Sequence, residues 1–399
     1  MSLPIVPITK LSFDNTEIAF KHQSNKEIKQ SYWLFKAISN NLLVKIGPFF
    51  TKLALGIKLP ISAVIKATIF KQFCGGEDIQ ECTSVIHKLA KENVGTILDY
   101  SVEGEEFEEA FDHTQSEIIN TIKKAVELPH AIPFCVFKVS GIARFALLEK
   151  INAQEELSKL EQYEWEKALA RVNAICEVAS QYQKKIMIDA EESYIQDAID
   201  QIALDMMAKY NKTTAIVYNT YQLYRHDKLA SLIADTTIAQ TTPFILGAKL
   251  VRGAYMEKER KRAKMLNIPS PIQPNKEATD RDYDAAISFC VENINHVSFI
   301  AGTHNQKSCE ILAERIEFLA LQPNHQHVYF SQLLGMSDNL SFNLANAGFN
   351  VAKYVPYGPI KAVMPYLFRR AQENTSVAGQ TGRELSLIQK ELERRRKEK

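Results

Sequence analysis

The feature that most constrains the fold of this chain is a regular alternation that begins near residue 93. From there, short apolar runs rich in β-branched residues alternate with long segments of helical periodicity. The runs are continuous rather than alternating with polar residues, a pattern typical of parallel strands that are buried on both faces. Eight runs follow this description, at 94–100, 134–141, 185–191, 214–220, 246–253, 297–305, 327–335 and 350–358.

The segments between these runs have the apolar spacing of helices. We predict helices at 155–182, 193–211, 222–240, 279–293, 306–320 and 360–374. Eight strand–helix units are what a (βα)8 barrel requires. A doubly wound open sheet is the alternative, but no G-x-G-x-x-G motif follows the first strand, which weakens a dinucleotide-binding fold. The sequence therefore predicts an α/β TIM-like barrel.

The chain before and after the barrel follows other patterns. We expect an irregular arm over 1–20 and several helices over 26–90, with apolar residues at helical spacing across 42–55 and breaks at Pro48 and Pro60. The end of the chain reads "KELERRRKEK", which indicates an exposed helix or a frayed end. The predicted domains are thus an N-terminal arm and helical region at 1–92, a catalytic barrel at 93–375 and a charged tail at 376–399.

Composition excludes several classes of protein. With 48 basic and 47 acidic residues the net charge is +1, so no overall basic field for nucleic acid exists. The six cysteines are scattered without zinc-site spacing, so we expect no metal, and we expect buried thiols in a reducing compartment. The first residues do not resemble a signal peptide, and no run of about 18 uncharged apolar residues predicts a membrane span. Peripheral membrane contact stays open.

Polar residues gather where the predicted strands end, which is the face that carries active sites in barrel enzymes. A solvated rim is the alternative, but the strand interiors are so apolar that a functional site is favoured. These strand-end residues are Asp99, Glu103, Lys138, Asp189, Glu191, Gln222, Lys249, Arg252, His304, Asn305, Gln332 and Tyr354.

Lys138, within "VFKVSG", offers either a cation for a substrate carboxylate or an amine for a Schiff base. The alternative is a structural ion pair with Asp189 or Glu191 on the next strand. The residue type alone does not separate these interpretations.

The segment "AKLVRGAYMEKER" combines two cations, Lys249 and Arg252, with the small residues Gly253 and Ala254 and the ring of Tyr255. Small residues allow close approach to the backbone, and a ring stacks on a planar ligand, so the segment suits a flavin or a nucleotide. A tight strand-to-helix turn that needs glycine is the structural alternative.

Two further motifs indicate anion recognition. His304 and Asn305 lie where a strand meets a helix N-terminus, which favours a pyrophosphate, with a capping pair as the alternative. Adjacent Arg369 and Arg370 on the last barrel helix suit a carboxylate clamp, and Glu373 has the spacing to orient either arginine. A solvent-exposed ion pair is the alternative for the arginines.

These strings together resemble the proline dehydrogenase family. The resemblance covers residues 93–375 and rests on "IDAEES", "NTYQLY", "KLVRGAYMEKER", "GTHN", "QLLGMSD", "YVPYG" and "YLFRRAQENT" in that order. Among them, "KLVRGAY" and "RRxxEN" are the most specific. The absence of an aldehyde dehydrogenase segment makes the chain similar to the monofunctional form.

The resemblance implies a distorted (βα)8 barrel, noncovalent FAD, oxidation of L-proline to Δ1-pyrroline-5-carboxylate, and transfer of the electrons to a quinone. It implies a cytoplasmic enzyme with peripheral contact at the inner membrane left open. The flavin contacts it implies are Asp189, Gln222, Lys249, Val251, Gly253, Ala254, Tyr255, Thr279, His304 and Asn305. The proline pocket it implies consists of Lys138, Leu333, Tyr354, Arg369, Arg370 and Glu373, and Asp189 is also placed among the catalytic residues. A gating carboxylate is expected at Glu103 or Glu105.

Two other functions stay open from the residues alone. One is a Schiff-base aldolase or lyase that uses Lys138 on a barrel strand. The other is a non-catalytic barrel whose helical N-terminal region binds a partner. A flavin spectrum, trapping of an imine by borohydride, or the absence of both would separate the three hypotheses.

Overall fold

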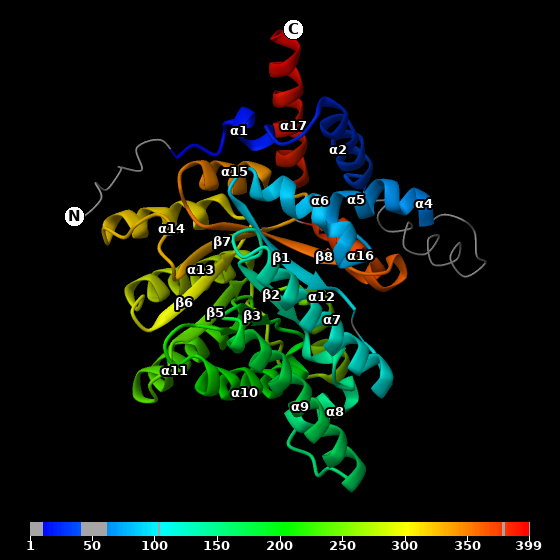
Figure 1. Cartoon of the computed structure of the whole chain (residues 1–399), viewed down its shortest axis with the longest axis vertical. Coiled ribbons are helices and arrows are strands. Elements are labelled where there is room, and N and C mark those ends of the chain that lie inside the picture. Colours follow the sequence, from blue (N-terminus) through cyan, green and yellow to red (C-terminus); the bar gives the residue numbers. More distant parts are fainter. Residues whose placement is uncertain (1–10, 41–61, 103, 377–379, 399) are drawn as a thin grey trace.

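The computed structural model describes residues 11–40, 62–102, 104–376 and 380–398, with side chains outside the description at 372–381. Eight parallel strands form a closed barrel in which each strand pairs with the next and the last pairs with the first (Figure 1). The predicted barrel is therefore confirmed. The strands are β1 Val94–Tyr100, β2 Phe134–Phe137, β3 Lys185–Ile188, β4 Val217–Gln222, β5 Leu246–Val251, β6 Val297–Gly302, β7 Val328–Leu333 and β8 Val351–Tyr357.

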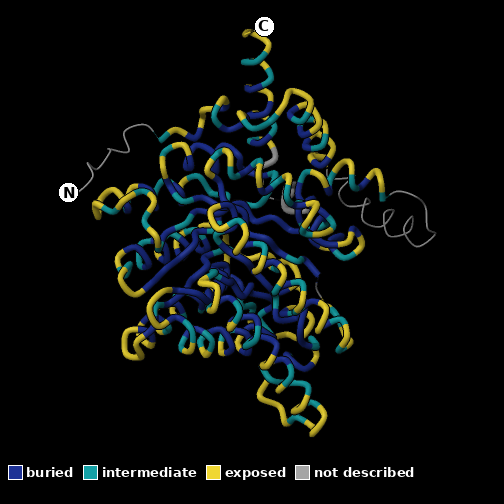
Figure 2. Tube along the Cα trace, in the orientation of Figure 1, coloured by how far each residue is buried: buried dark blue, intermediate teal, exposed yellow. Residues whose placement is uncertain are grey.

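The strands are buried on both faces, as their continuous apolar runs predict (Figure 2). Inside the barrel, Phe134, Met187, Tyr218 and Ile300 pack together. A larger cluster fills the layer between the outer face of the sheet and the helices. All six cysteines are buried and none forms a disulfide, as expected from their scattered positions.

Helices follow the strands and cover the outer face of the barrel. All six predicted helices are present, but the predicted 222–240 begins only at Lys228 because the preceding residues end strand β4 and form a turn. The predicted strand 214–220 is correspondingly displaced toward the helix, since β4 begins at Val217 and ends at Gln222. The barrel helices are α7 Glu108–Glu127, α8 Phe145–Asn152, α9 Lys159–Gln181, α10 Ser193–Tyr210, α11 Lys228–Thr241, α12 Met256–Leu266, α13 Lys276–Glu292, α14 Gln306–Phe318, α15 Asp338–Asn346 and α16 Ile360–Ser376.

The N-terminal region is helical, and it is joined to the end of strand β8. Backbone hydrogen bonds link Gly75 N to Pro356 O at 2.8 Å and Gly358 N to Gly76 O at 3.1 Å. The expectation for 42–55, with Pro48 and Pro60, lies outside the described residues. The elements are α1 Thr16–Phe20, α2 Asn25–Ile38, α4 Ser62–Ile65, a π-helical turn η1 Lys66–Phe70, α5 Lys71–Phe73 and α6 Ile79–Ala90.

One expectation about the ends of the chain is wrong, and another holds in part. Within the predicted irregular arm, Thr16–Phe20 forms helix α1, whose N-terminus is capped by the side chain of Asn15. The charged tail forms helix α17 (Gln380–Lys397), which is exposed at Glu393, Arg396 and Lys397 as expected, but which also packs one face against α1 and α2 (Figure 1). Its inner face includes Ile388 and Glu391, and the carboxylate of Glu391 binds Arg394 and Arg395. The boundaries at 92 and 375 stay predictions.

Candidate active site

Asp189, directly after β3, is the centre of a buried polar cluster at the carboxyl ends of the strands. One carboxylate oxygen of Asp189 lies 2.5 Å from the Nζ of Lys249 on β5. The other accepts hydrogen bonds from the Tyr354 hydroxyl of β8 at 2.8 Å and from Lys138, just after β2, at 3.3 Å. Three residues predicted from the sequence as site members therefore converge on a fourth.

A second carboxylate completes this cluster. Asp99 of β1 lies 3.9 Å from the Nζ of Lys138 and accepts a hydrogen bond from the hydroxyl of Ser101. Lys138 thus bridges two carboxylates. The predicted alternative, an ion pair between Lys138 and Asp189, is present. Glu191 accepts a hydrogen bond from the Ser140 amide at 3.0 Å.

The two carboxylates differ in their affinity for a proton. Burial raises the pKa of both, but the positive charges of Lys249 and Lys138 outweigh that effect at Asp189 and hold its pKa at about 2. At Asp99 burial prevails over the charge of Lys138, and the charge of Asp189 raises its pKa further. Asp189 is therefore an anion at neutral pH.

Tyr354 is held as a neutral hydrogen-bond donor. Burial and the adjacent anion Asp189 raise the pKa of its hydroxyl well above its ordinary value. The Nζ of Lys249 also lies 4.7 Å from the centre of the tyrosine ring, within the range of a cation–π contact. The ring is therefore fixed between Lys249 and the carboxylate.

The predicted arginine pair lies on helix α16, and both guanidinium groups stack on aromatic rings. Arg370 is 7% exposed and lies 5.2 Å from the ring centre of Tyr366, so the interpretation as an exposed ion pair is wrong for Arg370. Arg369 is half-buried and lies 5.7 Å from the ring centre of Tyr255. Glu373 is in the same helix, but its side chain lies outside the description.

Tyr366 is a neighbour of the arginine pair that the sequence reasoning did not select. It precedes Arg369 and Arg370 by three and four positions, so the helical spacing places it beside both. That spacing is the signal that could have identified it. Glu103, one candidate for the gating carboxylate, lies outside the described residues, and the assignment of Glu105 stays a prediction.

The turn after β5 has the character expected of a strand-to-helix connection. Gly253 has a φ of +137°, and a Cβ there would lie 2.5 Å from the ring of Tyr224, so only glycine fits. Gly253 and Ala254 are exposed at the end of the strand, next to Val251 and Tyr255, which are half-buried. The turn therefore leaves Gly253 and Ala254 accessible to a ligand near the strand end that follows Lys249.

Arg252 has a structural role, which corrects the expectation of two ligand-facing cations in this segment. Its guanidinium bonds Asp280 at 2.7 Å, Thr303 at 2.7 Å and Ser308 at 3.0 Å, and it lies 4.3 Å from the ring centre of Tyr283. Arg252 therefore ties β5 to its neighbours, and Lys249 is the cation of this strand that faces the cluster.

The predicted flavin contacts on β4 and α13 are buried. Gln222 ends β4 opposite Val251, and its side-chain oxygen finds no hydrogen-bond partner among the residues that the structure describes. Thr279 of α13 is buried, and its hydroxyl donates to the Asn275 carbonyl at 3.3 Å. A buried carbonyl oxygen left unpaired is costly, so Gln222 is suited to a donor on a bound ligand.

The "GTHN" motif lies between β6 and α14. The side chain of Asn305 caps α14 by accepting hydrogen bonds from Lys307 N at 2.9 Å and Ser308 N at 3.4 Å, which is the predicted alternative role. His304 contacts Ser337 Oγ at 2.9 Å and accepts a hydrogen bond from the Leu333 amide at 3.4 Å. Both side chains therefore support the strand ends around the cluster.

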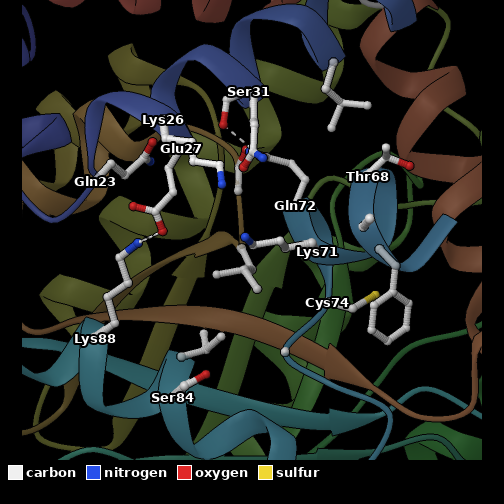
Figure 3. A pocket seen from close by; sticks show the side chains of 18 of the residues that line it. Gln23, Lys26, Glu27, Ser31, Thr68, Lys71, Gln72, Cys74, Ser84 and Lys88 are labelled. Carbon is white, nitrogen blue, oxygen red and sulfur yellow. Dashed lines mark hydrogen bonds and ion pairs between the residues drawn. The ribbon is translucent and has the colours of Figure 1, made fainter. Parts of the chain in front are cut away.

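A separate cavity lies among the N-terminal helices. It has a volume of about 1600 Å3 and is lined mainly by α2, η1, α5 and α6 (Figure 3). Its polar walls bind one another, since Lys88 pairs with Glu27 at 2.7 Å and Ser31 bonds Gln72 at 2.9 Å. None of Asp189, Lys249 and Arg370 lines this cavity, so it is not the predicted site.

The fold and the cluster define the class of protein as a (βα)8 barrel enzyme, with a buried polar cluster at the carboxyl ends of its strands. A family model described as "Proline dehydrogenase" matches residues 82–383, and the chain therefore belongs to the proline dehydrogenase family. The family and the kind of enzyme predicted from the sequence are confirmed.

Curated relatives match over most of the chain. The chain is 32% identical to "Proline dehydrogenase 1, mitochondrial" of Dictyostelium discoideum, over 97% of this chain and 75% of that protein. It is 31% identical to "Carbapenem antibiotics biosynthesis protein CarD" of Pectobacterium carotovorum subsp. carotovorum, over 81% of this chain and 83% of that protein. The family thus includes proteins named for different metabolic roles.

A solved structure supports the fold independently. Proline utilization A (PutA) of Bdellovibrio bacteriovorus, inactivated by N-propargylglycine, superposes with a TM-score of 0.71 at 17% identity. The match covers 94% of this chain but only 40% of the PutA chain. At this identity the likeness shows the shared fold alone.

Proposed function

We propose that the chain catalyses the FAD-dependent oxidation of L-proline to Δ1-pyrroline-5-carboxylate, the first step of proline catabolism. The observation that carries this proposal is the convergence of Lys138, Lys249 and Tyr354 on Asp189, in a barrel of the proline dehydrogenase family. The buried Arg370 on α16 adds a cation of the kind that a carboxylate substrate requires.

The proposed pocket binds the two ends of proline differently. Arg369, Arg370 and Lys138 would hold the carboxylate, and Glu373 would orient the arginines. The ring of Tyr354 and the side chain of Leu333 would contact the apolar part of the substrate ring. This division suits a small amino acid with one charged group and one saturated ring.

The reaction requires the substrate amine to lose its proton before a hydride leaves the adjacent carbon. The cations of the pocket favour that loss, because like charges lower the pKa of a bound ammonium. Asp189 opposes part of this repulsion, but it is already paired with Lys249 and Lys138. The residues of the chain would thus contribute mainly position and electrostatics.

The residues around the cluster fit a flavin, because a buried oxygen of Gln222 lacks a partner and the backbone at Gly253 and Ala254 is open. When bound, FAD would supply the hydride acceptor. Lys249 would place a positive charge beside it. The full set proposed to hold FAD is Asp189, Gln222, Lys249, Val251, Gly253, Ala254, Tyr255, Thr279, His304 and Asn305.

A quinone is the proposed acceptor of the electrons, with peripheral contact at a membrane surface and a cytoplasmic location. The helices that the structure describes include none long and apolar enough to cross a membrane. Reduction of a soluble quinone analogue by the purified protein with L-proline, in the presence and absence of vesicles, tests this part of the proposal.

The central test is an anaerobic absorption spectrum of the purified protein. We expect a flavin spectrum that is bleached by L-proline and not by an amino acid without the ring nitrogen. A flavin that proline does not reduce would overturn the proposed reaction, and a colourless, folded protein would favour a non-catalytic barrel.

The Schiff-base alternative has its own test. Lys138 contacts two carboxylates, which favour its ammonium form, and an ammonium is not a nucleophile. We therefore expect no substrate adduct at Lys138 after borohydride treatment. A stable adduct at that position would replace the proposed reaction with an aldolase or lyase.

A further inference from the structure

The first turn of helix α17 contacts the loops that follow strands β6 and β7. Glu384 is 6% exposed, and its carboxylate accepts hydrogen bonds from the Ser337 amide at 2.7 Å and the Ser337 hydroxyl at 3.3 Å. The neighbouring Arg383 donates to the side chain of Gln306, at the start of α14. A helix outside the predicted barrel is thereby connected to its carboxyl-terminal face.

The hydrogen bonds continue from Ser337 toward the active site. The hydroxyl of Ser337 lies 2.9 Å from Nδ1 of His304, and Nε2 of His304 lies 3.4 Å from the Leu333 amide. Two side chains from two separate segments, Ser337 and His304, therefore connect Glu384 with the last residue of strand β7.

The backbone amide fixes the direction of this chain of hydrogen bonds. The Leu333 N–H is a donor, so Nε2 of His304 must accept and the proton of the neutral ring must be on Nδ1. Nδ1 then donates to the Ser337 oxygen, which leaves the Ser337 hydroxyl to donate to Glu384. Burial, followed by the charges of Lys353, Arg370 and Arg252, lowers the pKa of His304 to about 3, which keeps the ring neutral.

The end of the chain of hydrogen bonds is next to the proposed substrate pocket. Leu333 pairs in register with Tyr354, and the Leu334 amide donates to the Tyr354 carbonyl at 2.9 Å. Tyr354 in turn binds Asp189 through its hydroxyl. A shift of the β7 end would therefore move the wall of the pocket and the strand that bears Tyr354.

We propose that Glu384 is a positioning residue for substrate binding, which acts through Ser337 and His304 to fix the end of β7 at Leu333. Helix α17 is then part of the active-site support and not only a covering of the N-terminal helices. This inference rests on the proposed function, because it assigns Leu333 to the pocket for proline.

The test compares three variants of the full-length, flavin-loaded protein. Glu384→Ala removes the acceptor, and we expect the KM for L-proline to rise about tenfold with little change in kcat, because both buried hydrogen bonds from Ser337 lose their acceptor. Glu384→Gln keeps an oxygen that accepts both bonds from Ser337, so it should restore a KM within about twofold of the wild type. Leu387→Ala loosens the packing of α17 but keeps every hydrogen bond of Glu384, so it should leave the KM unchanged.

A second measurement does not depend on turnover. Hydrogen exchange of the β7 carboxyl-terminal peptide should be faster in Glu384→Ala than in the wild type and unchanged in Leu387→Ala. If Glu384→Ala does not fold, Ser337→Ala interrupts the same chain and should have the same effects on exchange and KM.

The possible failures are distinguishable. Normal proline oxidation by the wild type, with equal KM values and equal exchange in Glu384→Ala or Ser337→Ala, would overturn the role of Glu384. A similar rise of KM in Leu387→Ala would show loose packing and overturn it as well. Absence of proline oxidation in the wild type would instead refute the proposed function, and the exchange data alone would then decide whether Glu384 supports β7.

Discussion

Two buried aspartate–lysine pairs lie on opposite faces of strand β8, and they differ in the groups that surround them. Tyr354 faces the pair of Asp189 and Lys249, and the adjacent Lys353 pairs with Asp338 at 2.8 Å. Neighbouring residues of a strand point to opposite faces, so one strand serves both clusters. We call them the Asp189 cluster and the Asp338 cluster.

The clusters differ in what else their members bind. Lys353 also donates to the main-chain oxygens of Leu333 at 3.3 Å and Met336 at 2.5 Å, and the second oxygen of Asp338 accepts a hydrogen bond from Gln23 at 2.9 Å. The Asp338 cluster therefore binds the turn after β7 and the segment that precedes helix α2.

The Asp189 cluster retains unused hydrogen-bonding capacity. Within the part of the chain that the structure describes, Asp99 Oδ1 and Gln222 Oε1 have no hydrogen-bond partner. Its lysines contact the carboxylates of Asp99 and Asp189. The difference therefore lies at the lysines: main-chain oxygens bind Lys353 beside Asp338, whereas the carboxylate of Asp189 binds both Lys249 and Lys138.

The largest effect that would test this difference is on stability. Lys353→Met leaves the Asp338 charge buried and two carbonyls without a donor, so we expect a loss of about 3–5 kcal/mol in the free energy of unfolding. Lys249→Met leaves Lys138 and Tyr354 on Asp189, and its loss should be about 1.5 kcal/mol. Denaturant unfolding measures both, and equal losses would contradict the distinction between the clusters.

The second prediction concerns binding of the substrate carboxylate by Arg370. Arg370→Met should raise the KM for L-proline ten- to a hundredfold, since a charge-assisted hydrogen bond in a closed pocket contributes about 1.5–3 kcal/mol. Flavin content should stay unchanged. Arg315→Met is the matched control, because Arg315 makes a surface ion pair with Glu292 at 3.6 Å and should not affect proline binding. A normal KM in Arg370→Met would remove Arg370 from the pocket.

The third prediction concerns the shape of the pocket at Tyr354. We expect L-proline to be preferred over trans-4-hydroxy-L-proline by at least about tenfold in kcat/KM, because the ring leaves a substrate hydroxyl buried without a partner. Tyr354→Ser should reduce that ratio, whereas Tyr354→Phe keeps the ring and should preserve it. Equal wild-type efficiencies for both substrates would refute the assignment.

The last prediction concerns the pH dependence of stability, which should have opposite signs near the two clusters. Burial, with the charge of Asp338, raises the pKa of Glu384 to about 7, so its contribution is present below about pH 4 and is lost as the pH rises toward 7. The pKa of Asp189 is lowered to about 2, so its contribution is present above about pH 4 and is lost as the pH falls toward 2.

Denaturant unfolding across these ranges measures both slopes. Relative to Glu384→Gln, the wild type should lose stability between about pH 4 and 7. Relative to Asp189→Asn, it should lose stability between about pH 4 and 2. Slopes of the same sign in both comparisons would contradict the electrostatic difference between the sites.

The barrel was predictable because its signal is local. A strand buried on both faces must be apolar at every position, and that property can be read from the sequence without knowledge of its neighbours. The same reasoning failed at α17, where the buried Glu384 and Glu391 have the sequence pattern of a solvated helix. Their burial depends on Ser337, Arg394 and Arg395, and only the folded chain brings Ser337 to Glu384.

The site was predictable as a list of strand-end residues and not as a set of pairings. Lys249 and Tyr354 are both predicted as site residues because they lie at strand ends, and in the structure both contact Asp189. The sequence could not show that Arg252 is bound by Asp280 and Thr303, or that Asn305 caps its own helix. Those roles depend on register and on partners far along the chain.

Closure of the barrel has a consequence for the order in which the molecule folds. Strand β1 carries Asp99 and strand β8 carries Tyr354, and these strands pair directly although most of the barrel lies between them in sequence. Contacts of such long separation carry the greatest loop-closure entropy and form slowly. Helices and neighbouring strand pairs should therefore assemble first. Asp99 would reach Lys138 and Asp189 in their final arrangement only when β1 pairs with β8 and closes the barrel.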